Sequence, residues 1–208
     1  MSSALREPWF DIARQRESSV LAMWLFLATE VLFFGGLFAG YAVYRSLHTT
    51  EFLAGAKQTD IVYGAVNTLV LLTSSFAMAV GVRFAREGLA RFARLCFGTT
   101  ALLGLLFLIV KSLEYDDDIS KRLVPGPGFA LPLRGAEIFW TLYWVMTVIH
   151  ALHLLIGICA VVRLWLAARN DPTWLRESPA AEVTALYWHF VDVIWVFLFP
   201  LLYLAGRA

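Results

Sequence analysis

Five long apolar segments constrain this chain more than any other feature of the sequence. A helix that crosses a lipid bilayer needs about 20 consecutive, mainly apolar residues. The segments that meet this requirement are residues 19–44, 62–82, 95–113, 136–162 and 183–204. Hydrocarbon offers no hydrogen-bond partner to the backbone, so each segment is expected to form a helix. The sequence therefore predicts an all-α integral membrane bundle of five transmembrane helices.

The composition supports this fold class and excludes others. Hydrophobic residues make up 60% of the chain and charged residues 16%, whereas a soluble domain carries about 45–50% and about 25%. The mean hydropathy is +0.69. A formal net charge of +1 creates no strong field that would attract nucleic acid. The loops are too short to hold a second domain, so residues 1–208 are expected to form one unit.

The distribution of lysine and arginine predicts the orientation, because positive residues concentrate in cytoplasmic loops. With the N-terminus inside, the inner segments carry Arg6, Arg14, Arg16, Arg83, Arg86, Arg91, Arg94, Arg163, Arg169 and Arg176. The outer segments carry Arg45, Lys57, Lys111, Lys121, Arg122, Arg134 and Arg207. We therefore expect a cytoplasmic N-terminus and a C-terminus on the outer, periplasmic side.

An acidic run follows the third apolar segment. Residues 114–118 read Glu-Tyr-Asp-Asp-Asp, and residues 125–128 read Pro-Gly-Pro-Gly. The Pro-Gly alternation favours turns and stops a helix. Acidic triplets can bind calcium, but the spacing of an EF-hand loop is absent. We expect a solvated acidic surface in this loop, with a calcium site as the alternative.

The last apolar segment contains two ionisable residues, His189 and Asp192, three positions apart. An ionisable side chain at bilayer depth costs roughly 2.5–3.5 kcal/mol, so it normally has a partner or a task. Spacing i, i+3 places both residues on one face of a helix. We expect both to face protein and to hold this helix against the fourth segment through His150 or His153.

Glu30 and the two histidines of the fourth segment also lie at depth. His150 and His153 could ligate haem or a metal, but zinc or copper needs three or four close ligands. A haem takes one histidine from each of two helices, and His189 provides no second pair for these two. Hydrogen bonds between helices are therefore expected instead, with three acidic candidates as partners: Glu30, Glu114 and Asp192. For Glu30 three readings stay open, namely a protonated structural carboxyl, a proton-handling group and a contact to a lipid head group.

Small residues and proline add packing signals without chemistry. Gly36 and Gly40 form a small-xxx-small pair, which favours close helix contact in membranes. Pro200 predicts a kink near the outer end of the fifth segment. Cys96 and Cys159 lack ligand spacing and are expected to be small buried hydrophobes. No catalytic residue, cofactor ligand or metal ligand is assigned.

Several motifs resemble the subunit III family of haem–copper respiratory oxidases, specifically the five-helix form of cytochrome c oxidase subunit III. They are Glu30-Val31-Leu32-Phe33-Phe34, Asn67-Thr68, Leu113-Glu114-Tyr115, His150-Ala151-Leu152-His153-Leu154-Leu155-Ile156-Gly157 and the run from Tyr187 to Trp195. Together they extend over nearly the whole chain from Trp24 to Tyr203, and the last two motifs are the most specific.

The resemblance implies a non-redox accessory subunit of a terminal oxidase, in a bacterial inner membrane. Haem and copper are then expected in partner subunits, with subunit I in direct contact and subunit II and other respiratory chains nearby. The family stabilises the catalytic subunit, supports proton uptake and binds phospholipid in a cleft. Six polar residues would be related to lipid or protons: Glu30, Glu114, His150, His153, His189 and Asp192. Long forms have two further helices that wall the cleft, so a lipid site here would be open or completed by another chain.

Three alternatives remain at this point. The first is the homologous subunit III of a quinol oxidase, which also has a five-helix form. The second is an accessory membrane protein of nitric oxide reductase. The third, from a different class, is a small membrane transporter, although no inverted repeat or broken midplane helix is visible.

Overall fold

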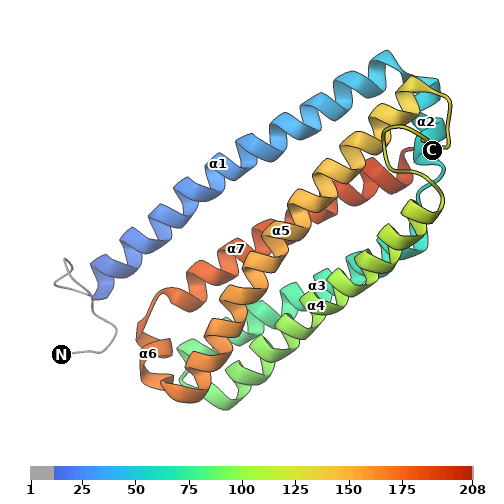
Figure 1. Ribbon diagram of the computed structural model, residues 1–208. Helices are drawn as coiled ribbons and strands as arrows, with labels where there is room; N and C mark the ends of the chain where they lie inside the picture. Colours follow the sequence, from blue (N-terminus) through green and yellow to red (C-terminus); the bar gives the residue numbers. More distant parts are fainter. Residues whose placement is uncertain (1–11, 208) are drawn as a thin grey trace.

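The computed structural model describes residues 12–207, and within them every regular element is helical (Figure 1). Five helices are long and apolar enough to cross a membrane. They are α1 (Ile12–Leu47), α3 (Ile61–Arg86), α4 (Ala90–Ser120), α5 (Arg134–Asn170) and α7 (Ala180–Phe199). Three short elements connect or end them: α2 (Thr49–Ala56), α6 (Pro172–Glu177) and a π-helical turn η1 (Pro200–Leu204). The predicted all-α bundle of five spans is confirmed.

The helices run past the apolar segments that predicted them, and α4 shows this most clearly. It continues to Ser120, so the acidic residues 114–118 lie in the last turns of a helix. The expectation of an acidic loop there is wrong, and Glu114 and Asp118 are buried instead. A helix satisfies its backbone hydrogen bonds internally, so it can continue beyond the apolar layer that hydropathy detects.

Close packing in the bundle depends on glycines that face large side chains. A Cβ atom at Gly81 would lie 2.9 Å from the ring of Phe97, which shows how tightly α3 and α4 approach each other. A Cβ atom at Gly104 would lie 2.8 Å from the ring of Trp188 and 2.9 Å from Ile158. Aromatic side chains fill the centre, with Trp140, Trp188 and Trp195 buried among the largest.

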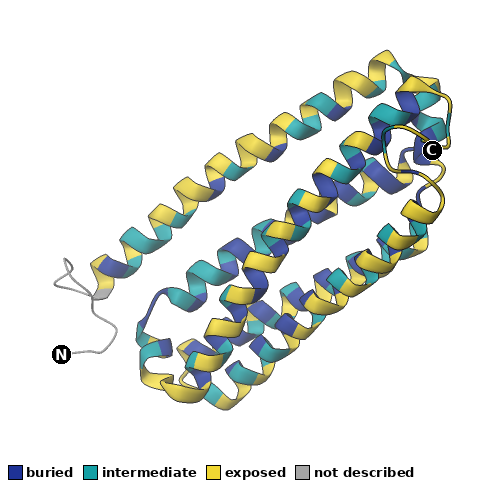
Figure 2. Ribbon diagram, in the orientation of Figure 1, coloured by how far each residue is buried: buried dark blue, intermediate teal, exposed yellow. Residues whose placement is uncertain are grey.

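Helix α1 is the least embedded of the spans. It runs along α5 and α7 (Figure 1), and near its N-terminal end Arg16 forms an ion pair with Glu182 of α7. Figure 2 shows it largely exposed, whereas buried residues concentrate in α5 and α7. Gly36 and Gly40 have no atom within 4 Å of an added Cβ, so their expected helix contact is absent within the described chain. The prediction that Cys159 is buried is also wrong, because its side chain is exposed.

The C-terminal end of α7 changes its winding at Pro200. Proline has no amide hydrogen, so the α-helical ladder loses a bond at this position. The chain continues as η1 and ends against α2, where a Cβ at Gly206 would lie 2.8 Å from the amide nitrogen of Lys57. This turn directs Tyr203 into the bundle, where the residue is fully buried.

Candidate functional site

A buried charged cluster joins α4, α5 and η1. Lys111 and Glu114 lie about one turn apart on α4, with 3.0 Å between Nζ and Oε2. Each is 1% exposed. Lys111 also donates to the hydroxyls of Tyr143 on α5, at 2.9 Å, and Tyr203 on η1, at 2.7 Å. The ammonium group thus holds three elements together from inside the bundle.

The hydroxyls of the two tyrosines also contact carboxylates on α4. Both hydroxyls donate to Oε1 of Glu114, at 2.8 Å from Tyr143 and 2.7 Å from Tyr203. Tyr143 is also 2.9 Å from Oδ2 of Asp118. We refer to Lys111, Glu114, Asp118, Tyr143 and Tyr203 as the Lys111 cluster.

Local structure explains why these side chains meet. Spacings of three and four residues place Lys111, Glu114 and Asp118 on one face of α4. The start of α5 is fixed by Glu51 of α2, whose carboxylate accepts the amide of Gly135 at 2.6 Å. Sequence reasoning identified Glu114 but counted Lys111 as an outer-loop charge, and this assignment is wrong because Lys111 is buried in α4. The i, i+3 spacing from Lys111 to Glu114 was the signal that could have found the pair.

The other predicted site residues do not converge. His153 Nε2 lies 3.1 Å from Oε2 of Glu30, so these residues join α5 to α1 by the expected hydrogen bond between helices. His189 Nδ1 lies 2.7 Å from the Ser75 hydroxyl on α3. The prediction that His189 binds the fourth span through a histidine is therefore wrong; α7 reaches α5 instead through Tyr187, which donates to the backbone oxygen of His153 at 3.0 Å.

His150 and Asp192 are buried, and both have side-chain polar atoms that lack a hydrogen-bond partner. The His150 ring lies 5.6 Å from the centroid of Phe107 and 5.2 Å from that of Trp195. Neither ring nitrogen of His150 has a hydrogen-bond partner among residues 12–207, and the same holds for Oδ1 of Asp192. Aromatic rings pack around this histidine.

The residues present do not fit haem or a metal ion. His153 is hydrogen-bonded to Glu30, His189 to Ser75, and His150 is packed against Phe107 and Trp195, so the described contacts of these histidines are not those of a pair of axial ligands. Within residues 12–207, no three His, Cys, Asp or Glu side chains gather closely enough to hold a metal. In the Lys111 cluster an ammonium occupies the position between the carboxylate and the tyrosines where a cation would sit.

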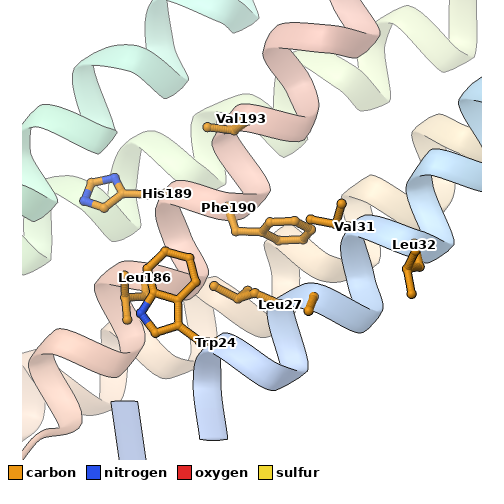
Figure 3. Close-up of a pocket in the computed structure, with 9 residues that line it drawn as sticks. Trp24, Leu27, Val31, Leu32, Leu186, His189, Phe190 and Val193 are labelled. Carbon is orange, nitrogen blue, oxygen red and sulfur yellow. The ribbon is translucent and has the colours of Figure 1, made fainter. Parts of the chain in front are cut away.

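An apolar groove lies between α1 and α7 (Figure 3). It has a volume of about 640 Å³. Its lining is almost entirely hydrocarbon and aromatic: Trp24, Leu27, Ala28, Val31 and Leu32 from α1, and Leu186, His189, Phe190 and Val193 from α7. The groove continues along Trp24 and His189 into a smaller cavity of about 300 Å³ that reaches Arg86.

Arginines gather at the end of this groove, around Glu182 of α7. Arg16 of α1 and Arg86 of α3 both form ion pairs with the Glu182 carboxylate, the second at 2.6 Å. A cavity of about 420 Å³ lies at this end. Its lining includes these three residues and Arg176, which is exposed. Three guanidinium groups and one carboxylate thus line this cavity beside an apolar channel.

Comparison with known proteins assigns this architecture to a family. The family model described as cytochrome c oxidase subunit III matches residues 15–207, which include nearly the whole of the described bundle. Cytochrome c oxidase subunit 3 of Thermostichus vulcanus is 34% identical over 90% of this chain and 88% of its own length. The corresponding Synechocystis protein is 32% identical over 86% and 72%. Cytochrome bo(3) ubiquinol oxidase subunit 3 of Pseudomonas aeruginosa is 30% identical over 91% and 86%. These similarities show that the chain belongs to the cytochrome c oxidase subunit III family.

Proposed function

We propose that this chain is a non-redox accessory subunit of a cytochrome c oxidase in the bacterial inner membrane. The observation that carries the proposal is the family match over residues 15–207, which includes all five spans. The lack of a gathered ligand set among the described residues supports placing haem and copper in partner chains. Subunit I is the proposed direct partner, with subunit II and other respiratory chains in the same complex, and the whole chain acts as one domain.

The proposed orientation keeps the N-terminal end of α1 in the cytoplasm. Burial of Lys111 removes one charge from the outer count and strengthens the positive-inside argument. Arg6, one of the inner charges, lies outside the described residues. In this orientation the arginines around Glu182 lie on the cytoplasmic side, and the Lys111 cluster lies towards the outer side.

The groove between α1 and α7 is proposed to hold a phospholipid. An acyl chain matches its apolar lining, because burying each CH₂ group yields about 0.8 kcal/mol. Arg86 and Arg176 at its end supply the fork-shaped donors that suit a phosphate. Glu30 and His153 join α1 to α5, so their proposed role is to hold α1, one wall of this groove, against the rest of the bundle. His189, which lines the groove, would contact the lipid directly.

Two matched pairs of variants test the lipid site. Ala28→Trp fills the groove, whereas Ala39→Trp adds the same side chain at an exposed position of α1 outside it. Arg176→Gln removes a head-group donor, and Arg169→Gln removes an exposed arginine near the same end. Native mass spectrometry of the chain purified in mild detergent should show fewer retained phospholipids for the first member of each pair. Equal retention across all four variants would contradict the lipid proposal and leave the accessory function untouched.

Subunit III of a quinol oxidase is a second candidate, favoured by the 30% identity to the Pseudomonas aeruginosa ubiquinol oxidase subunit. The family description and the greater identity to two cytochrome c oxidase subunits favour the first candidate. The two are distinguished by purifying the complex through a tag on this chain and measuring oxygen consumption with reduced cytochrome c and with quinol. Oxidation of quinol alone would transfer the assignment to the second candidate.

A further inference from the structure

The Lys111 cluster has more hydrogen-bonding pairs than it has hydrogens. An ammonium group carries three hydrogens. All three are used in the pairs from Lys111 to Glu114 Oε2, Tyr143 Oη and Tyr203 Oη, at 3.0, 2.9 and 2.7 Å. Lys111 therefore has no hydrogen left to give.

Each tyrosine hydroxyl adds one hydrogen. The hydrogen of Tyr203 is directed to Glu114 Oε1, at 2.7 Å. Tyr143 has two carboxylate oxygens within reach, Glu114 Oε1 at 2.8 Å and Asp118 Oδ2 at 2.9 Å. A single hydroxyl hydrogen makes only one short, straight bond. With both carboxylates ionised, one of these two oxygen–oxygen pairs lacks a hydrogen.

The charge of the cluster leads to the same conclusion independently. One ammonium and two carboxylates sum to a single negative charge. Lys111 and Glu114 are 1% exposed and Asp118 is 3% exposed. A buried charge without a counter-charge is strongly disfavoured. One added proton neutralises the cluster and also supplies the missing hydrogen.

We propose that the Lys111 cluster is a proton-binding site that holds one exchangeable proton on Oδ2 of Asp118. The proton is donated to Tyr143 Oη, and Tyr143 donates its own hydrogen to Glu114. The added proton is not placed on Glu114, because that carboxylate already accepts three hydrogens, from Lys111, Tyr143 and Tyr203. Asp118 has the single hydroxyl of Tyr143 as its partner in the cluster.

Asp118 is also the member nearest to the end of its helix, two residues before Ser120 closes α4. Release of the proton breaks the Oδ2–H bond, passes the proton to water at this end and leaves the cluster with one negative charge. The charged or titratable groups around the cluster are Tyr115, Asp117 and Lys121 of the α4 end, Asp60 before α3, His150 of α5 and Arg207 after η1. Asp117 accepts from Lys121 at 2.5 Å, and this hydrogen bond raises the pKa of Lys121.

Infrared difference spectroscopy of the full chain in detergent tests the site, because a protonated carboxyl has a C=O stretching band that shifts in D₂O. Asp118→Asn should remove one such band per chain, while its amide still donates to Tyr143 and keeps the fold. Asp116→Asn, at an exposed position of the same helix, should leave the band in place. An unchanged spectrum for Asp118→Asn would overturn the proposal, and so would loss of the band in Glu114→Gln but not in Asp118→Asn.

A second measurement does not depend on assigning bands. The folded state holds a proton that the unfolded chain releases, so wild-type stability should fall as the pH rises. Asp118→Asn should abolish this fall, and Asp116→Asn should retain it. Tyr143→Phe removes the acceptor of the proton and should shift the carboxyl band to higher frequency. A wild-type stability that is independent of pH, or equal pH dependence in wild type and Asp118→Asn, would contradict the site.

Discussion

Replacing Lys111 with methionine should destabilise the bundle by about 3–5 kcal/mol, the cost of removing one partner from a buried ion pair. Lys111 and Glu114 are each 1% exposed, and Nζ makes three hydrogen bonds of 2.7–3.0 Å. Methionine fills a similar volume, so the loss should come mainly from the carboxylate of Glu114, which keeps its burial and loses its counter-charge. Two tyrosine hydroxyls lose a donor at the same time.

A double-mutant cycle separates this electrostatic effect from general damage to the core. Lys111→Met combined with Glu114→Gln leaves no unpaired charge, so it should recover about 1–3 kcal/mol relative to the sum of the two single variants. The assay is unfolding in mixed micelles of mild detergent and dodecyl sulfate, followed by circular dichroism. Lys121→Met provides the control, because its pair with Asp117 is on the surface and is worth about 0.2–1 kcal/mol. Equal losses for Lys111→Met and Lys121→Met, or strict additivity in the cycle, would refute the reasoning.

Three further predictions address packing and the contacts between helices. Gly104→Ala should cost about 1–3 kcal/mol in the same assay because its Cβ would lie 2.8 Å from Trp188; Gly40→Ala, with open space around it, should be neutral or stabilising, and the reverse order would contradict the packing. Glu30→Leu should lower the stability by about 1–3 kcal/mol, because Nε2 of His153 loses its partner, whereas Glu30→Gln should keep the hydrogen bond. Equal stability of the two variants would show that Glu30 has no structural partner. Ser75→Ala should weaken the contact between α3 and α7 by about 0.5–1.5 kcal/mol, because His189 loses its hydroxyl partner, while Thr73→Ala on the exposed side should not; equal losses would contradict the His189 contact.

The spans were predictable because a long apolar run in a membrane has few alternatives to a helix. Their ends were not, since hydropathy detects the apolar layer and α4 continues past it to Ser120. For this reason the acidic run was predicted to lie in a loop, and Lys111 was predicted to be a surface charge. The polar residues inside the spans were predicted one by one to bond to a neighbouring helix. Glu30 of α1 and His153 of α5 do form such a bond.

What the sequence left open was which helices face each other. The i, i+3 spacing of His189 and Asp192 correctly placed them on one helix, but spacing within a helix carries no information about its neighbours. Ser75 of α3, rather than a histidine of α5, proved to be the partner of His189. Tyr143 and Tyr203 join the Lys111 cluster from distant parts of the sequence, and the position of Tyr203 depends on the change of winding at Pro200.

The accessory role is tested most directly by purifying the chain from its native membranes through a C-terminal tag and analysing the complex. Oxidase subunit I should be recovered with this chain, together with haem and copper. After mild dissociation, the metal and the haem absorbance should remain with the partner chains. Recovery of this chain without oxidase subunits, or one haem bound per isolated chain, would show that it is not a non-redox accessory subunit.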